Sequence, residues 1–165
     1  MRNINFLFTA ALLALLGSFS PAALADNGAI KVTSIAQVEI EAIDKKGKKT
    51  IKRAPVTKAV PGTEVIYTTT FENTLKKPAD NINIDNPVPN DSEYKGGSAF
   101  GKDCEILFSA DGGKTFGHAE QLKIKGADGK ERAALPKEFT HIRWSYKKQL
   151  APGKSGEVGF RAVVK

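Results

Sequence analysis

The stretch that decides the fold reads PGTEVIYTTTFEN over residues 61–73, followed by ADNINIDNPVP over residues 79–89. The Pro-Gly pair predicts a turn, and the residues after it alternate between apolar and polar side chains, as in a half-buried strand. A polar break precedes a second alternating segment. That segment ends in Pro-Val-Pro, because proline cannot donate to the ladder of a central strand. This order of signals is typical of one strand pair in an antiparallel β-sandwich.

The same alternation recurs through the rest of the chain. A long first strand is predicted from Ile30 to Ala42, and the Lys45–Lys49 loop turns it back. No segment repeats its apolar residues with the helical period. We therefore predict an all-β, immunoglobulin-like antiparallel β-sandwich of about seven to nine strands. The predicted core lies on the apolar parity of these strands and comprises Val65, Tyr67, Phe71, Ile82, Ile84, Ile106, Phe108, Ile142, Trp144, Tyr146, Val158 and Phe160.

The first 25 residues have the order of a secretory signal peptide. Arg2 supplies a positive start, the run Phe6–Leu16 is almost entirely apolar, and small residues precede a predicted cleavage between Ala25 and Asp26. The apolar run is shorter than the roughly 20 residues that a spanning helix needs, so we expect no membrane span. The sequence predicts a single domain at 26–165, located in the periplasm or secreted.

The charge balance bears on the choice of partners. The chain holds 25 lysines and arginines against 18 acidic residues, a formal charge of +7, and most of the positive charge is lysine. Arginine forks are the usual readers of phosphates and bases, so we predict no nucleic-acid partner. The basic excess is interpreted as an aid to solubility or as a source of weak attraction to anionic cell-envelope surfaces. The Lys45–Lys49 loop is interpreted as a solvated hairpin tip that discourages edge pairing, with an anion-binding loop as the alternative.

The chain has one cysteine, so no internal disulfide can form. Cys104 shares its parity with Ile106 and Phe108, which places it on the apolar side of a predicted strand. We interpret it as a buried, unreactive thiol. An intermolecular bridge is the alternative.

Taken together, several segments resemble the bacterial surface and periplasmic family known as domain of unknown function eleven. The resemblance rests on the Pro-Gly-Thr-Glu-Val-Ile-Tyr segment, on Asn73 at the end of that strand and on the Asn-Pro-Val-Pro exit at 86–89. The segments 109–116, 142–144 and 150–160 extend it, so that it covers roughly residues 61–165. The resemblance implies an immunoglobulin-like sandwich and no catalytic residues. The family often forms tandem repeats, and the single copy here favours a small stand-alone exported protein.

One motif suggests an enzyme at first sight. The segment 109–116 fits the Asp-box pattern, which resembles the hairpin turns of sialidase-like propellers. Such a propeller needs several blades of about 40 residues, more than this chain supplies. We therefore predict a structural turn, in which Ser and Asp oxygens accept backbone N–H bonds and the aromatic residue enters the core. Its residues are Ser109, Asp111, Gly113, Thr115 and Phe116.

Other catalytic or metal-binding patterns are weak. His118 and His141 lie far apart and lack metal-type spacing, so both are interpreted as surface histidines. Asp80, Asp85 and Asp91 leave open a calcium-binding loop, although they lack the regular ladder of ligands. We predict no catalytic residue, no metal site and no cofactor.

The function expected from the sequence is a non-enzymatic exported structural or interaction module of the bacterial cell envelope. An envelope protein or polymer is the expected partner. A fibre or pilus-like subunit assembled by strand exchange is the alternative, compatible with the first and last strands. A glycan-active enzyme, suggested by the Asp-box alone, is a remote third possibility. A core position between the sheets is the first interpretation of Trp144, and a binding-site tryptophan is the second.

Overall fold

A computed structural model describes residues 29–165, which form an all-β fold without any α-helix. The predicted signal peptide, with its cleavage after Ala25, lies outside the described residues. No helix within the described range has the length and apolar character required to cross a membrane. The strands are β1 (Ile30–Ile43), β2 (Lys49–Pro55), β3 (Glu64–Asn73), β4 (Asn83–Pro87), β5 (Ser92–Tyr94), β6 (Phe100–Gly101), β7 (Cys104–Ser109), β8 (Lys123–Lys125), β9 (Glu131–Ala133), β10 (His141–Tyr146) and β11 (Ser155–Val164).

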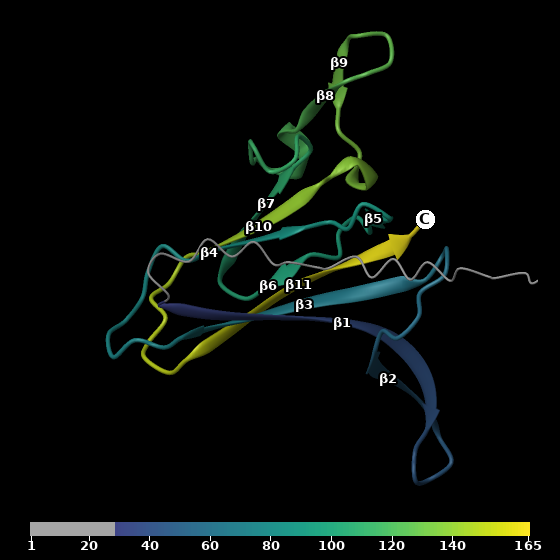
Figure 1. The fold of residues 1–165 in the computed structure, drawn as a ribbon, viewed down its shortest axis with the longest axis vertical. Helices are drawn as coiled ribbons and strands as arrows, with labels where there is room; N and C mark the ends of the chain where they lie inside the picture. The colour runs from purple at the N-terminus through teal and green to yellow at the C-terminus, as the bar shows by residue number, and fades with distance from the viewer. Residues whose placement is uncertain (1–28) are drawn as a thin grey trace, which may run out of the picture.

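The strands form antiparallel sheets in a sandwich-like arrangement (Figure 1). The larger sheet has the order β2-β1-β3-β11-β5, with β6 also paired to β11, and the smaller sheet has the order β4-β10-β7. The short hairpin β8–β9 stands apart as a third sheet. The described strands number eleven rather than the expected seven to nine, because polar segments form additional strands of only two or three residues. The last strand, β11, is a middle strand of its sheet.

The two main sheets enclose an apolar core. Trp144 on β10 has no exposed surface and lies 6.2 Å from Phe160 on β11, measured between ring centroids. This places the tryptophan between the sheets. Of the predicted core residues, the buried ones are Val65, Phe71, Ile82, Ile84, Ile142, Trp144, Val158 and Phe160. Partly buried and packed against them are Tyr67, Ile106, Phe108 and Tyr146. Core residues that the sequence analysis missed are Ile66, Val88, Tyr94, Ala134, Phe139, Leu150 and Ala162.

A buried polar bridge joins the two sheets. Asn86 on β4 donates from Nδ2 to Oγ1 of Thr69 on β3, at 2.8 Å. The same Thr69 oxygen is 2.8 Å from Oγ of Ser34 on β1. Buried amides are tolerated when they are hydrogen-bonded, and this one fixes the relative position of three strands from both layers.

A second buried asparagine, Asn73, closes one end of the larger sheet. Its Nδ2 donates to the carbonyls of Lys77 and Leu150, both at 2.8 Å. Its Oδ1 accepts the N–H of Leu75 at 2.9 Å, and its backbone exchanges hydrogen bonds with Gly153 and Lys154. One side chain therefore holds two loops that lie far apart in sequence.

The thiol of Cys104 is less buried than predicted. The side chain faces the core from the first position of β7 and is half-buried rather than enclosed. Burial, together with the nearby Asp103 carboxylate, raises the pKa of the Cys104 thiol.

Candidate interaction surface

The most distinctive surface is a two-stranded ribbon, residues 38–55, that projects from the larger sheet (Figure 1). Strand β1 pairs with β3 only as far as Gln37. Beyond that point β1 pairs with β2 alone, up to Ile43 opposite Lys49. Beyond Gln37 the ribbon is therefore a two-stranded extension of the sheet, and none of its residues is among the apolar residues packed against the core.

The ribbon exposes large apolar side chains. Ile43 and Ile51 are 72% and 71% exposed, and Ile40 is 45% exposed. Ile40 has the same parity as Val32, which packs against the core, and the sequence pattern therefore predicted a continuous apolar face. Ile40 continues that face, whereas Ile43 and Ile51 have the other parity and share the opposite face of the ribbon. Exposed apolar residues on both faces at one end of a small protein indicate an interaction site.

The ribbon ends in a tight turn with a lysine-rich surface. The carboxylate of Asp44 accepts the backbone N–H groups of Lys46 and Lys48, at 2.8 and 2.9 Å. Gly47 has a φ of 79°, a conformation that side chains with a Cβ rarely adopt. The Asp44 carboxylate is therefore hydrogen-bonded within the turn, and the lysine side chains are exposed to solvent. The predicted hairpin tip at Lys45–Lys49 thus has a defined shape.

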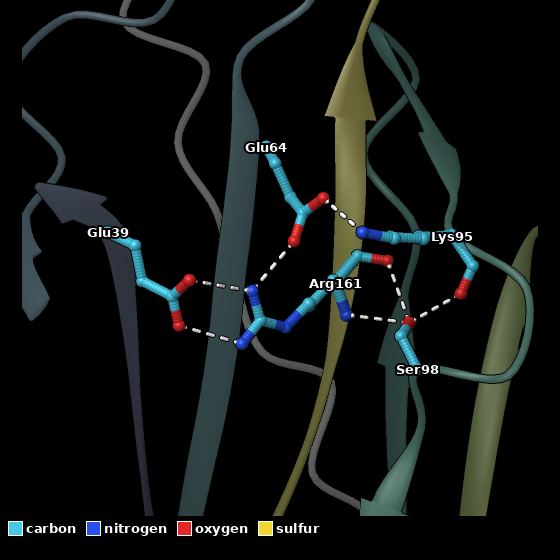
Figure 2. A network of polar contacts seen from close by, with 5 residues as sticks. All are labelled: Glu39, Glu64, Lys95, Ser98 and Arg161. Atoms are coloured by element: carbon cyan, nitrogen blue, oxygen red, sulfur yellow. Dashed lines mark hydrogen bonds and ion pairs between the residues drawn. The ribbon is translucent and has the colours of Figure 1, made fainter. Parts of the chain in front are cut away.

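An ion-pair network fixes the root of the ribbon on the sheet (Figure 2). The Arg161 side chain starts on β11 and crosses β3 to reach β1, where its Nη2 donates to Glu39 at 2.8 Å. Its Nη1 donates to Glu64 on β3 at 2.7 Å, and Lys95 donates to the other oxygen of Glu64 at 2.6 Å. The guanidinium therefore links three adjacent strands of the larger sheet, β1, β3 and β11.

The network lowers the pKa values of both carboxylates. The pKa of Glu39 lies below its usual value mainly because of the hydrogen bonds from Arg161. The pKa of Glu64 is lowered first by the hydrogen bond from Lys95 and then by Arg161. The same contacts raise the pKa of the Arg161 guanidinium, which is charged at any accessible pH. Because the three groups stay charged at neutral pH, they hold the ribbon root as a fixed ionic cluster.

Ser98 supports this network from the loop between β5 and β6. Its Oγ accepts the N–H of Arg161 at 3.0 Å and lies within hydrogen-bonding distance of the carbonyls of Lys95 and Arg161 (Figure 2). The serine thus ties the backbone of the two cationic residues together. None of these residues was singled out from the sequence as part of a site, because their separation in the chain gives no local signal.

The Asp-box turn has the predicted local geometry. Ser109 Oγ accepts the N–H of Gly113 at 2.9 Å and donates to Asp111 Oδ1 at 2.7 Å. Asp111 accepts the N–H groups of Lys114 and Thr115 and the hydroxyl of Thr115. These bonds, the one from the Thr115 hydroxyl first, hold the pKa of Asp111 well below its usual range. Each of these acceptor oxygens is used within the turn itself.

The aromatic residue of the Asp-box was misplaced by the sequence analysis. Phe116 lies on the outer face of the smaller sheet, where the Arg143 guanidinium carbon sits 3.9 Å from its ring centroid. Asp85 orients this guanidinium through bonds of 2.7 and 2.6 Å. The ring covers an ion-paired arginine instead of entering the core, since a cation–π contact is available on that face.

The two histidines occupy separate environments. His118 Nε2 is 3.5 Å from Glu105 at the surface. His141 packs beside Gly113, and burial lowers its pKa. Asp85 is committed to Arg143, and within residues 29–165 no three histidine, cysteine or acidic residues cluster as metal ligands.

An open hollow of about 340 Å³ lies between the start of β4 and the end of β10. It is lined by Asp80, Asn81, Ile82, Asn83, Ser145, Tyr146, Lys147, Lys148 and Gln149. The lining is mostly polar and faces solvent, unlike the enclosed apolar pockets that bind small molecules. Asp80 is thus a rim residue of this hollow.

The chain matches no known protein family, no curated protein and no solved structure.

Proposed function

We propose that this chain is a non-enzymatic, exported interaction module of the cell envelope. Its scaffold is an immunoglobulin-like sandwich, and the ribbon at 38–55 is the surface that contacts the partner. The observation that carries this proposal is the exposure of Ile40, Ile43 and Ile51 on a projecting, shaped hairpin. The leader-like residues 1–25 and the resemblance to the domain of unknown function eleven support export and a non-catalytic role.

The energetics favour contact through the ribbon. Burying an isoleucine side chain completely yields about 1.5–3 kcal/mol, so covering the exposed parts of Ile43 and Ile51, which share one face of the ribbon, yields about 1–2 kcal/mol each. The ribbon root is already held by Arg161, which reduces the ordering cost of binding. The Asp-box turn, by contrast, uses its polar atoms internally, and this argues against a glycan-active site there.

Binding to isolated cell envelopes tests the proposal. The processed protein is mixed with envelopes and the bound fraction is measured after centrifugation. We expect binding that falls strongly in the double variant Ile43→Ser/Ile51→Ser. The matched control Leu135→Ser, at a residue 49% exposed next to the other projecting hairpin, should bind as the unchanged protein does. Absence of binding, or equal loss in the control, would overturn the proposal.

One observation favours a second candidate, a subunit assembled by strand exchange. Within the described residues, the outer edge of β2 has no strand partner, and such an edge can accept an added strand. The last strand is a poor donor, because β11 is paired with β3 on one side and with β5 and β6 on the other. Size-exclusion chromatography separates the candidates, since strand exchange predicts polymers and the interaction module predicts discrete species.

A further inference from the structure

The tip of the ribbon combines exposed apolar side chains with a lysine-rich turn. Ile43 and Ile51 are the most exposed large apolar residues that the structure describes. Both lie on the same face, because Ile43 pairs with Lys49 and Ile51 pairs with Glu41. Around them, the segment from Glu41 to Lys52 carries five lysines and only two carboxylates.

Both carboxylates are occupied within the hairpin. Asp44 accepts the N–H groups of the turn, and Glu41 pairs with Lys49 at 3.4 Å. Lys45, Lys46 and Lys48 form no ion pair within residues 29–165. The tip thus presents aliphatic side chains surrounded by unneutralised ammonium groups.

Exposed aliphatic side chains surrounded by ammonium groups suit an anionic lipid surface better than an apolar groove on a protein. We propose that the ribbon tip docks on an anionic phospholipid surface, with Ile43 and Ile51 entering the interfacial region and the lysines contacting the headgroups. The inference rests on the proposed function and specifies its partner. Shallow apolar insertion combined with basic residues is the physical basis of peripheral membrane binding. Lysine also suits this role, since it acts as a point charge toward many phosphates without a fixed fork geometry.

The placement of the tip permits such docking. The ribbon projects beyond both sheets, so a flat surface can approach it without meeting the rest of the fold (Figure 1). At the opposite end, the β8–β9 hairpin also carries lysines, namely Lys123, Lys125 and Lys130. Its central apolar residue, Ile124, is partly buried against the core. This hairpin is therefore a matched basic control that lacks the exposed isoleucine pair.

The test uses vesicles of pure lipid, with no envelope protein or polymer present. The processed chain is mixed with vesicles containing phosphatidylglycerol or with neutral phosphatidylcholine vesicles, and partition is measured by co-sedimentation. A lysine near an anionic surface contributes about fivefold to binding at low salt. Replacing Lys45, Lys46, Lys48 and Lys49 with glutamine should lower the partition coefficient by at least about tenfold. Replacing the three lysines of the β8–β9 hairpin, together with Lys137 in the short turn that follows it, with glutamine should change the coefficient by less than about threefold.

The apolar contribution is measured separately. Ile43→Ser/Ile51→Ser should lower partition by about tenfold at a salt concentration where the lysine effect is screened. The variant Ile51→Trp adds a fluorescent reporter, because the natural Trp144 has no exposed surface and gives a constant background. Its emission should shift to the blue on anionic vesicles and not on neutral ones.

The outcomes are distinguishable. Equal binding to neutral and anionic vesicles, equal losses in both lysine variants, or an unshifted Ile51→Trp emission would overturn the lipid inference. If the lipid inference fails in this way but the chain still binds isolated envelopes through the ribbon, its partner is a protein or polymer and the proposed function stands. If ribbon-dependent binding fails with envelopes as well, both proposals are wrong.

Discussion

The hydrogen bonds by which the Asn73 side chain joins two loops, here called the Asn73 clasp, can be tested by two substitutions that differ in a single group. In Asn73→Ala, the carbonyls of Lys77 and Leu150 and the N–H of Leu75 lose their side-chain partner. Asn73 has no exposed surface, and the Leu150 carbonyl keeps a second partner in the N–H of Ala79. Three hydrogen bonds at about 1 kcal/mol each, with some penalty for buried unpaired groups, predict a loss of about 3–4 kcal/mol.

The change Asn73→Asp keeps the shape and the acceptor for Leu75. It places a carboxylate oxygen where an amide donated to the carbonyls of Lys77 and Leu150, each 2.8 Å away. A buried, unpaired charge beside two carbonyl oxygens costs more than a missing side chain, about 3–5 kcal/mol. At pH 7 we therefore expect Asn73→Asp to be no more stable than Asn73→Ala, although it is the closer isostere.

The two variants should differ in how their stability depends on pH. Burial and the facing carbonyls raise the folded-state pKa of the introduced carboxyl above its unfolded value of about 3.9. The penalty is present above the folded pKa and disappears as pH falls through it. Urea denaturation from pH 7 to pH 4.5, each point referred to the unchanged protein, should show Asn73→Asp recovering by about 1–2 kcal/mol while Asn73→Ala stays constant. A pH-independent difference, or losses below 1 kcal/mol in both variants, would refute the clasp.

Three further predictions concern the rest of the fold. Gly159→Ala should lower the free energy of unfolding by about 3 kcal/mol, because the added Cβ would lie 2.5 Å from the carbonyl oxygen of Tyr67. As a control, Gly47→Ala should lower it by only about 1 kcal/mol, because the new Cβ meets no atom within 4 Å and only the positive φ is unfavourable. Thermal unfolding measures both. Alkylation of Cys104 should be slower in the folded than in the urea-unfolded protein at pH 8, since its pKa is raised; equal rates would contradict this. The unchanged protein should lose stability as pH falls below 4.5, because the depressed pKa values of the carboxylates bonded to Arg161 stabilise the fold only while they are ionised. Arg161→Met should make stability depend less steeply on pH, and an unchanged dependence would show that the Arg161 network does not cause the loss at acid pH.

Local alternation predicted the strands well where a single parity decides burial. The segment from Val65 to Phe71 has its apolar face inward, and Ile82 and Ile84 extend the core in the next strand. The turn at Ser109 was predictable for the same reason, since its hydrogen bonds close within a few residues. Such features depend on neighbours in sequence.

Features that depend on distant partners were not predictable. Ile66 has the parity opposite to the predicted core residues of its strand, yet it is buried, because Arg161 lies directly opposite it and extends across β3 toward Glu39. Tyr94 and Phe139 join the core from segments without a strand pattern. Conversely, Ile40 has the correct parity for burial but lies beyond the reach of the smaller sheet. No local pattern states where the second layer ends.

The central claim is that the ribbon, and no other part of the surface, contacts the partner. Photo-crosslinking in cells that export the chain tests this most directly, with a photoreactive amino acid placed at Ile51 or, as a control, at Leu135. The account predicts a light-dependent adduct, with lipid or with envelope protein, from position 51 and little or none from position 135. An adduct from position 135 alone, or no adduct from position 51 in correctly exported protein, would contradict it.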